Sequence, residues 1–500
     1  MTRCAVLAVV CAACAPAGAE PAARPTATLA LTPVCEAGSP SALDVALTVP
    51  DLHGAPMFRL DDSLLGTPGM AALIGDVQLS DDRGAIVVRR SMTVGAGKEL
   101  VVAGSRPAVG AVTLRYRARS VPAGASGARE GLRHDGSGIA GLGAAFVLLP
   151  EVQASYDIRV DWLAGSCGVL TTATTFSSAR SAPLDTLRDA AYVAGHPRTF
   201  AHDDGSMHLR SIWLGTMAFD PAVASAWAAR ALAAERAFFG DTDPTPYQIV
   251  VRVLGEMADN SNGTGYRTAF LSAIGPATTW GRKLRRNIAH EMFHRWLART
   301  LWLAGPDNSS LWFTEGFDVY YANLLMLRAG LISPDEYLDE LASTITRLFA
   351  NPHAAASNDE IRRGFIADNV LAVVPYARGA LYAAELDGSI RAASHGRRSL
   401  DDVMRELYRA AVAAGHELPA TAVRDAVRHE LGAAGVARYD AVIEHGAMPE
   451  PSSDAFGPCF QRVPRRYAVL GRVDWLPAIT YRDAVAWERI PGVSDSRCIR

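Results

Sequence analysis

The five residues His290-Glu291-Met292-Phe293-His294 constrain this chain more than any other stretch. Residues four apart lie on one face of an α-helix, so His290 and His294 can each direct a ring nitrogen at a single metal ion. Glu291 lies beside them and can exchange a proton with a metal-activated water. This H-E-x-x-H pattern predicts a helix, one zinc ion and a hydrolytic site. With 12 histidines in 500 residues, chance would produce it in only about one such chain in a hundred.

The residues around the motif favour the same interpretation. Leu284, Ile288, Met292 and Trp296 recur at helical spacing and form a stripe that would pack on a core. His290 lies about 200° of helical rotation from Ile288, so the histidine pair faces away from that stripe. Two ordinary core histidines would leave Glu291 buried without a partner, which is costly. We therefore favour a metal site.

A third metal ligand is expected downstream, in Leu311-Trp312-Phe313-Thr314-Glu315-Gly316-Phe317. Glu315 stands at the start of an apolar helical stretch, and three protein ligands with one open position are typical of catalytic zinc. Asp318 follows one turn later. Asp318 could orient a histidine ring. Alternatively, it could only stabilise the start of the helix, where acidic side chains are favourable. Both interpretations of Asp318 stay open.

Three segments together resemble a known family: His-Glu-x-Phe-His-x-Trp at 290–296, Trp-Phe-Thr-Glu-Gly-Phe at 312–317 and Pro-Tyr-Ala-Arg-Gly-Ala at 375–380. Their order resembles the gluzincin metallopeptidases, and most closely the glycyl-aminopeptidase family, over roughly residues 30–457. The resemblance implies a thermolysin-like catalytic domain in which His290, His294 and Glu315 hold zinc. It also implies that Glu291 is the base and that Tyr376 donates a hydrogen bond to the developing oxyanion, which fits the physical needs of peptide hydrolysis.

The chain departs from the family pattern in three places, one of them Leu297, which stands where a polar asparagine often follows the tryptophan. Families of this kind usually carry a glutamate before the zinc helix that binds the amino group of the substrate, but residues 263–268 contain no acid. The PDZ domain common at the carboxyl end is expected to be absent, because little chain follows Asp454. We expect an aminopeptidase, with a zinc endopeptidase or a catalytically silent binding protein as alternatives. The strand around Gly263, Gly265 and Ala273 is expected to bind the backbone of a peptide substrate.

The predicted fold class is α+β and multidomain. We expect a signal peptide at 1–19, a β-rich, sandwich-like domain at 24–195, a thermolysin-like and mostly helical catalytic domain at 196–450, and a tail at 451–500. Short β-branched or alternating runs punctuated by Gly, Pro and Asp indicate the first domain. The glycine-rich stretch 121–143 is expected to be a mobile surface loop, and 262–265 a turn.

The beginning of the chain predicts export. Arg3 precedes an apolar run at 5–15, and Ala17-Gly18-Ala19 fits a cleavage site. The protein is expected to be periplasmic or secreted, and the alternative is a lipoprotein anchored through Cys14. Four cysteines lie beyond the signal and allow three pairings, of which we favour Cys35 with Cys167 and Cys459 with Cys498.

Composition limits the partners. Hydrophobic residues are 49% and charged residues 20% of the chain, as in globular proteins. A formal net charge of −3 gives no reason to expect nucleic acid. No other stretch reaches 18 uninterrupted apolar residues, so no transmembrane segment is expected in the mature chain. The expected partner is a peptide substrate, and the oligomeric state stays open.

Overall fold

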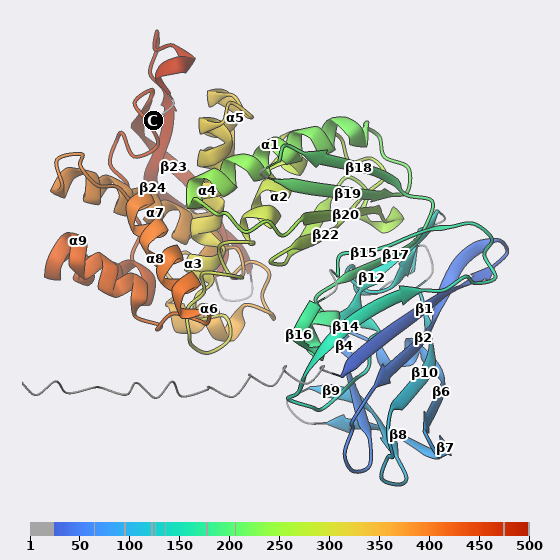
Figure 1. Ribbon diagram of the computed structural model, residues 1–500. Helices are drawn as coiled ribbons and strands as arrows, with labels where there is room; N and C mark the ends of the chain where they lie inside the picture. The colour runs from blue at the N-terminus through green and yellow to red at the C-terminus, as the bar shows by residue number, and fades with distance from the viewer. Residues whose placement is uncertain are drawn as a thin grey trace, which may run out of the picture.

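The computed structural model describes residues 25–64, 66–94, 97–121, 124–125, 127–135, 137–176, 179–205, 207–473 and 476–498. The expected signal peptide and Cys14 lie outside these residues. A β-rich region comes first and a mostly helical region follows (Figure 1), which confirms the predicted α+β fold class. Among the described helices, none combines the length and the apolar character needed to cross a membrane.

Two sheets pack face to face in the amino-terminal region. One has the order β16-β14-β1-β2-β10-β6-β7 and the other β13-β3-β9-β8. Alternate residues of β1, namely Ala27, Leu29 and Leu31, are fully buried and contribute to one core together with Phe58 and Val102 of the second sheet. Their bounds are β1 Thr26–Glu36, β2 Ser39–Val49, β3 Met57–Asp61, β6 Ile74–Asp81, β7 Gly84–Ile86, β8 Val88–Val94, β9 Lys98–Gly104, β10 Val112–Arg119, β13 Leu149–Pro150, β14 Ser155–Trp162 and β16 Ala179–Pro183, and β4 Ser63–Leu64 pairs with β5 Thr67–Pro68.

A third sheet, of order β11-β12-β17-β15, contains part of the stretch that we expected to be a mobile loop. The strands are β11 Arg133–His134, β12 Gly138–Leu142, β15 Thr171–Thr174 and β17 Ala191–Gly195. Every residue of β12 is buried, so the prediction for this part of 121–143 was wrong. The glycines that indicated a loop instead permit close packing: a side chain at Gly138 or Gly195 would overlap the neighbouring strand.

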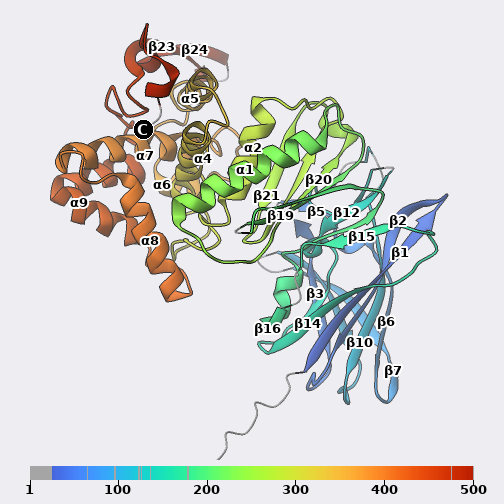
Figure 2. The ribbon, with the colours of Figure 1, turned by 45° about the horizontal axis from the view of Figure 1, so that its top comes forward.

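The next sheet, of order β18-β19-β20-β22-β21, joins the two regions. Helices α1 and α2 cover one of its faces, and β12 and β17 lie toward the other (Figure 2). The expected turn at 262–265 is instead the edge strand β21, paired antiparallel with β22. The bounds are β18 Arg198–Asp203, β19 His208–Leu214, β20 Tyr247–Val253, β21 Ser261–Gly265, β22 Ala269–Ile274, α1 Pro221–Phe239 and α2 Arg282–Phe293.

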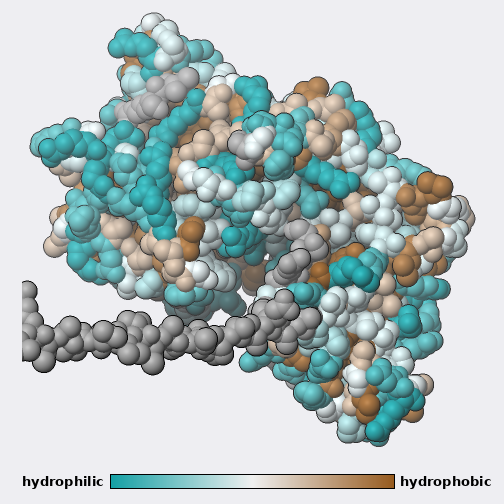
Figure 3. All heavy atoms as spheres, viewed as in Figure 1, coloured by the Kyte–Doolittle hydropathy of each residue, from teal (hydrophilic) through white to brown (hydrophobic). Residues whose placement is uncertain are grey.

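The remaining helices stack around α4 and α7, and the face seen in Figure 3 is mainly hydrophilic over this part. Ser333 caps α5 by accepting from the Glu336 backbone while the Glu336 side chain accepts from the Ser333 backbone, which fixes the start of that helix. The bounds are α3 Leu311–Thr314, α4 Gly316–Arg328, α5 Pro334–Phe349, α6 Asn358–Gly364, α7 Val374–Ala393, α8 Leu400–Ala414 and α9 Ala422–Tyr439.

The tail is a hairpin of β23 Phe460–Val473 and β24 Leu476–Arg489 that packs against α5 (Figure 1). Both favoured cysteine pairs are joined: Cys35 with Cys167, and Cys459 with Cys498. The domain boundary expected near residue 195 lies at the connection between β17 and β18. The domain limits themselves stay predictions, because they concern units that fold independently.

Candidate metal and catalytic site

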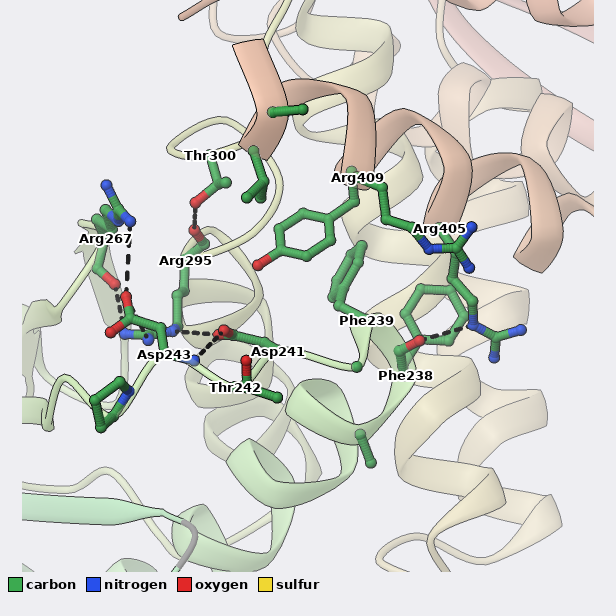
Figure 4. A pocket seen from close by; sticks show the side chains of 16 residues that line it. Phe238, Phe239, Asp241, Thr242, Asp243, Arg267, Arg295, Thr300, Arg405 and Arg409 are labelled. Atoms are coloured by element: carbon green, nitrogen blue, oxygen red, sulfur yellow. Dashed lines mark hydrogen bonds and ion pairs between the residues drawn. The ribbon is translucent and has the colours of Figure 1, made fainter. Parts of the chain in front are cut away.

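Helix α2 places the two histidines through its buried face. Ile288, Met292 and Trp296 are fully buried, as the stripe in the sequence predicts. The indole of Trp296 donates to Asp241 at 2.9 Å. Arg295 donates to the same carboxylate at 3.2 Å, as Figure 4 shows. The helix ends at Phe293, but His294 keeps helical backbone angles (φ −57°, ψ −19°). The rings of His290 and His294 therefore stay side by side, with centroids 4.7 Å apart.

Glu315 meets both histidines from the junction between α3 and α4. Its Oε2 lies 3.2 Å from Nε2 of His290 and 3.6 Å from Nε2 of His294. Ligands bound to zinc at about 2.0–2.2 Å in a tetrahedron are separated by roughly 3.3–3.6 Å. The spacing of Glu315 from the two rings thus fits one zinc ion, and two imidazoles with a carboxylate are the donors that catalytic zinc prefers.

Asp318 lies on the opposite side of the same rings. Its fully buried carboxylate is 2.7 Å from Nδ1 of His290 and 3.4 Å from Nδ1 of His294. Donor atoms of Asp318 and the two histidines lie within 4.8 Å of one another, so this trio is a second possible ligand set. We favour Glu315 as the ligand, because it faces the Nε2 atoms and leaves Nδ1–H free to donate to Asp318. The position of Asp318 suits a role in orienting the two histidine rings, and that role stays a prediction.

The charges around the rings shift their acidities. Burial disfavours the charged form of His290 and so lowers its pKa. The carboxylates of Asp318 and Glu315 outweigh this effect and raise the pKa of His290 well above the usual value. Burial opposes ionisation of Glu315 as well, yet His294 and His290 lower its pKa to about 2. The buried carboxylates thus favour a positive charge between them and the rings, which a bound metal cation would also supply.

Glu291 lies beside this centre and beneath strand β21. Its side chain is only 6% exposed, and burial raises its pKa, although His290 and His294 oppose the rise. A Cβ atom at Gly263 would lie 2.6 Å from Cγ of Glu291, and one at Gly265 would lie 2.8 Å from Cβ of His294. Only glycine lets the strand approach the metal helix this closely.

Tyr376 enters from the first turn of α7, directly after Pro375. Its hydroxyl hydrogen-bonds Glu315, and its ring centroid is 6.2 Å from that of His290. Burial and the neighbouring carboxylates raise its pKa well above 10, so the phenol keeps its proton and remains a donor. A Cβ at Gly379 would overlap the carbonyl oxygen of Trp312, so α7 reaches the α3–α4 junction only because glycine is present there.

Strand β21 offers a free backbone edge at the site, since β22 is its one partner among the described strands. The Gly265 carbonyl accepts from Nε of Arg299 at 2.9 Å rather than from β22. Alternate residues direct their backbone groups to the same side of a strand, so those of Gly263 also face the free edge. Ala273 does not share this free edge, because it lies on β22, whose backbone is paired with both β20 and β21.

The structure brings one acid to this strand that the sequence analysis missed. Glu130, 7% exposed, comes from the β-rich region, and its Oε1 accepts from the Asn262 side chain at 2.9 Å. Asn262 in turn lines the same cavity as His290 and Glu291. No local pattern marks Glu130, because it lies far from the motif within a glycine-rich stretch.

The cavity over the motif has a volume of about 250 Å³. Its walls include three positions that the sequence analysis did not single out, Arg286 on α2, Asn323 on α4 and Arg347 on α5. The lining residues are Asn262, Gly263, Arg286, Asn287, His290, Glu291, Val319, Ala322, Asn323, Thr344, Arg347 and Tyr376.

Comparison with known proteins agrees with this geometry. The family of M61 glycyl aminopeptidases matches residues 283–360. Among curated proteins, no match was found. An aminopeptidase N family protein from Idiomarina loihiensis has 17% identity and a TM-score of 0.71, covering 88% of this chain and 79% of its own. An M1 zinc metallopeptidase from Deinococcus radiodurans has 19% identity and a TM-score of 0.54, covering 86% and 96%. Yeast LTA4 hydrolase with bestatin has 13% identity and a TM-score of 0.51, covering 86% and 69%.

At these identities the solved structures establish the fold, and the family match covers the segment that carries both histidines and Glu315. The fold is thus shared with M1 zinc metallopeptidases over most of the chain. Together these findings confirm the resemblance predicted from the sequence, that to zinc peptidases of the glycyl-aminopeptidase type. Among the described residues, His290, His294 and Asp318 form a group that could hold a metal ion.

Proposed function

We propose that this chain hydrolyses peptide bonds with zinc held by His290, His294 and Glu315, and that it removes residues from the free amino terminus of its substrate. The observation that carries the proposal is the convergence of Glu315 on both Nε2 atoms, beside a buried Glu291 and beneath the free edge of β21. Zinc, when bound, acidifies water and polarises the scissile carbonyl.

The chain's own residues supply the remaining steps. The backbone of Gly263 pairs with the peptide and holds it extended along β21. Glu291 takes a proton from the attacking water and delivers it to the leaving amine, for which its raised pKa is suitable. Tyr376 turns from Glu315 to donate to the oxyanion that develops at the carbonyl.

Glu130 supports the preference for a free amino terminus. The strand before the zinc helix lacks the acid usual in this type of site, and Glu130 supplies a carboxylate there from the other region of the chain. A buried carboxylate is stabilised by a cation, and the ammonium group of a peptide provides one. Exclusion of water near it would strengthen that pairing.

The catalytic proposal is tested with Glu291→Gln. The variant keeps the shape of the side chain but cannot act as a base, so turnover of short peptides should fall by about 10²- to 10⁴-fold. Zinc content, measured by mass spectrometry, should stay near one per chain, as in the wild type. A wild type that holds zinc yet cleaves nothing in a broad peptide library would support a silent binding protein instead.

The amino-terminal preference is tested with pairs of peptides that differ only in an acetyl group on the first residue. The wild type should cleave the free-amine peptides and leave the acetylated ones intact. Glu130→Gln should lower kcat/KM for free-amine peptides by about tenfold or more through loss of the charge pairing. Equal cleavage of both peptides would mean that the chain is an endopeptidase.

We also propose that the chain is exported. Two disulfides are typical of proteins in an oxidising compartment. Amino-terminal sequencing of the natively expressed protein tests this. A free start near Glu20 fits the periplasmic or secreted form, a lipid-blocked start at Cys14 fits the anchored form, and retention of Met1 in the cytoplasm contradicts both.

A further inference from the structure

Helix α5 forms a row of ion pairs with the start of α2. Glu336 pairs with Arg285, and Glu340 pairs with Arg286 at 2.9 Å and with Arg282 at 3.2 Å. Positions 336, 340, 344 and 347 share one face of α5. On this face Glu336 and Glu340 are followed by Thr344 and then by Arg347. Thr344 and Arg347 line the cavity beside His290.

Arg347 has no acidic partner of its own among the described residues. In the part of the chain that the structure describes, no carboxylate lies within ion-pairing distance of its guanidinium, and the nearby Glu340 is already shared by two other arginines. Arg347 is exposed, yet partial burial of its guanidinium and the charge of Arg286 lower its pKa. An anion in the cavity would relieve this excess of positive charge.

A second cavity differs from the catalytic one in how its arginines are paired with acids. About 870 Å³ of space lies behind the zinc helix, between the loop after α1 and helix α8. There the inward arginine, Arg295, pairs with Asp241 and Asp243, and Arg267 also faces Asp243 (Figure 4). The arginines near the loop are thus neutralised by the protein itself, whereas Arg347 is not.

Charges of opposite sign lie near the catalytic cavity. Asn262 lines it and donates to the carboxylate of Glu130, which lies behind that wall, and Arg286 and Arg347 line it from α2 and α5. An extended dipeptide or tripeptide has an ammonium group at one end and a carboxylate at the other. With its scissile bond beside Glu291, its carboxylate falls one or two residues beyond, within a cavity of only about 250 Å³.

We propose that Arg347 binds the terminal carboxylate of the substrate, so that the site selects di- and tripeptides over longer chains and over peptides with a blocked carboxyl end. This rests on the proposed peptidase function. Arg286, held by Glu340, assists through its charge. The pairing is a charge-assisted hydrogen bond, for which a guanidinium fork is well shaped.

The test compares Ala-Ala and Ala-Ala-Ala with the same peptides amidated at the carboxyl end. The wild type should hydrolyse the free acids with kcat/KM about 10- to 100-fold higher than the amides, the range expected for one charge-assisted hydrogen bond. Arg347→Gln should remove this difference by lowering the values for the acids and leaving those for the amides within about twofold. Arg347→Lys should restore part of it.

The matched control is Arg409→Gln, an exposed arginine on α8 that lines the other cavity (Figure 4). It should leave the preference for free acids unchanged. A wild type without the preference, an Arg347→Gln variant that keeps it, or equal losses on acids and amides would each overturn the proposal. Equal losses would indicate a structural role for Arg347.

A binding measurement separates this proposal from the catalytic one. Calorimetry with the zinc-loaded Glu291→Gln variant should give a dissociation constant for Ala-Ala about tenfold or more below that for its amide, and adding Arg347→Gln should abolish the difference. If this holds while the wild type hydrolyses nothing, the catalytic proposal fails and carboxylate recognition stands. If the wild type hydrolyses peptides but neither assay distinguishes acid from amide, carboxylate recognition fails alone.

Discussion

Tyr376 reaches the site from a helix that is remote in sequence from the histidines, and its hydroxyl points at Glu315. Tyr376→Phe removes only that oxygen. We expect kcat to fall by about 10²- to 10³-fold, the usual effect of losing an oxyanion donor, with little change in KM. Zinc content should be unchanged, because the phenol is not a ligand.

The control for Tyr376 is Tyr481→Phe, since Tyr481 is 60% exposed on the tail hairpin. It should have wild-type kcat and zinc content. A loss of zinc in Tyr376→Phe would show that the hydroxyl supports Glu315 rather than the reaction, and unchanged turnover would remove Tyr376 from the mechanism.

Some site residues could be predicted from the sequence and others could not, for a physical reason. His290, Glu291 and His294 lie within one turn of a single helix, so local periodicity fixes their relation. Arg347 lines the cavity and Glu130 contacts Asn262 on its wall, and only the packing of the whole chain brings these two residues there. The inner position of Ala273 could not be foreseen, because a strand pattern does not tell an edge strand from an inner one.

At the scale of elements, the approach of α7 to the α3–α4 junction sets the distance between Tyr376 and Glu315. Gly379→Ala should disturb it, because the added methyl group overlaps the Trp312 carbonyl. We expect a loss of roughly 2–4 kcal/mol in the free energy of unfolding, measured by urea denaturation, together with weaker zinc binding.

The control is Gly388→Ala in the same helix, where the new methyl group would meet only the side chain of Ser452, which can turn away. Its higher helix propensity should leave stability equal to the wild type or slightly greater. If Gly379→Ala behaves in the same way, close packing at the junction does not position Glu315.

The same scale explains which elements could be predicted. Both ends of α8 are marked in the sequence, by a capping box at Ser399 and by a left-handed Gly415. The stretch 121–143 was misread because glycine signals both loops and close strand packing. Local composition cannot separate these two uses, since the second depends on which strand lies alongside.

At the scale of the whole molecule, the tail helps to hold the cavity wall. Arg482 of the hairpin donates to the carbonyls of Phe349 and Asn351 at the end of α5, at 2.8 and 3.2 Å. Aromatic contacts of Tyr337 with Phe460 and of Phe349 with Tyr467 lie along the same helix. The hairpin therefore supports the helix that carries Arg347, although it lies outside the family match at 283–360.

Arg252 joins the β-rich region to the catalytic sheet. It lies on β20, is fully buried, and donates to the carbonyls of Arg129 and Gly131, on the two sides of Glu130, and to that of Ala140 on β12. Burial lowers its pKa to about 10, and Glu130 opposes that change. Three carbonyls would lose their donor without it, so Arg252→Met should cost roughly 3 kcal/mol or more in stability.

The loss should reach the active site, because Arg252 fixes the segment that presents Glu130. We expect Arg252→Met to lower the melting temperature by about 5 °C or more and to speed proteolysis within 121–143. The value of kcat/KM for free-amine peptides should fall while zinc content is retained, since no zinc ligand lies on β20. Arg210→Met, on the exposed face of the adjacent strand β19, should change none of these. A variant of Arg252 that melts later or at the wild-type temperature, with normal kcat/KM, would mean that the interface of Ala140, Val193 and Leu271 holds Glu130 in place without the arginine.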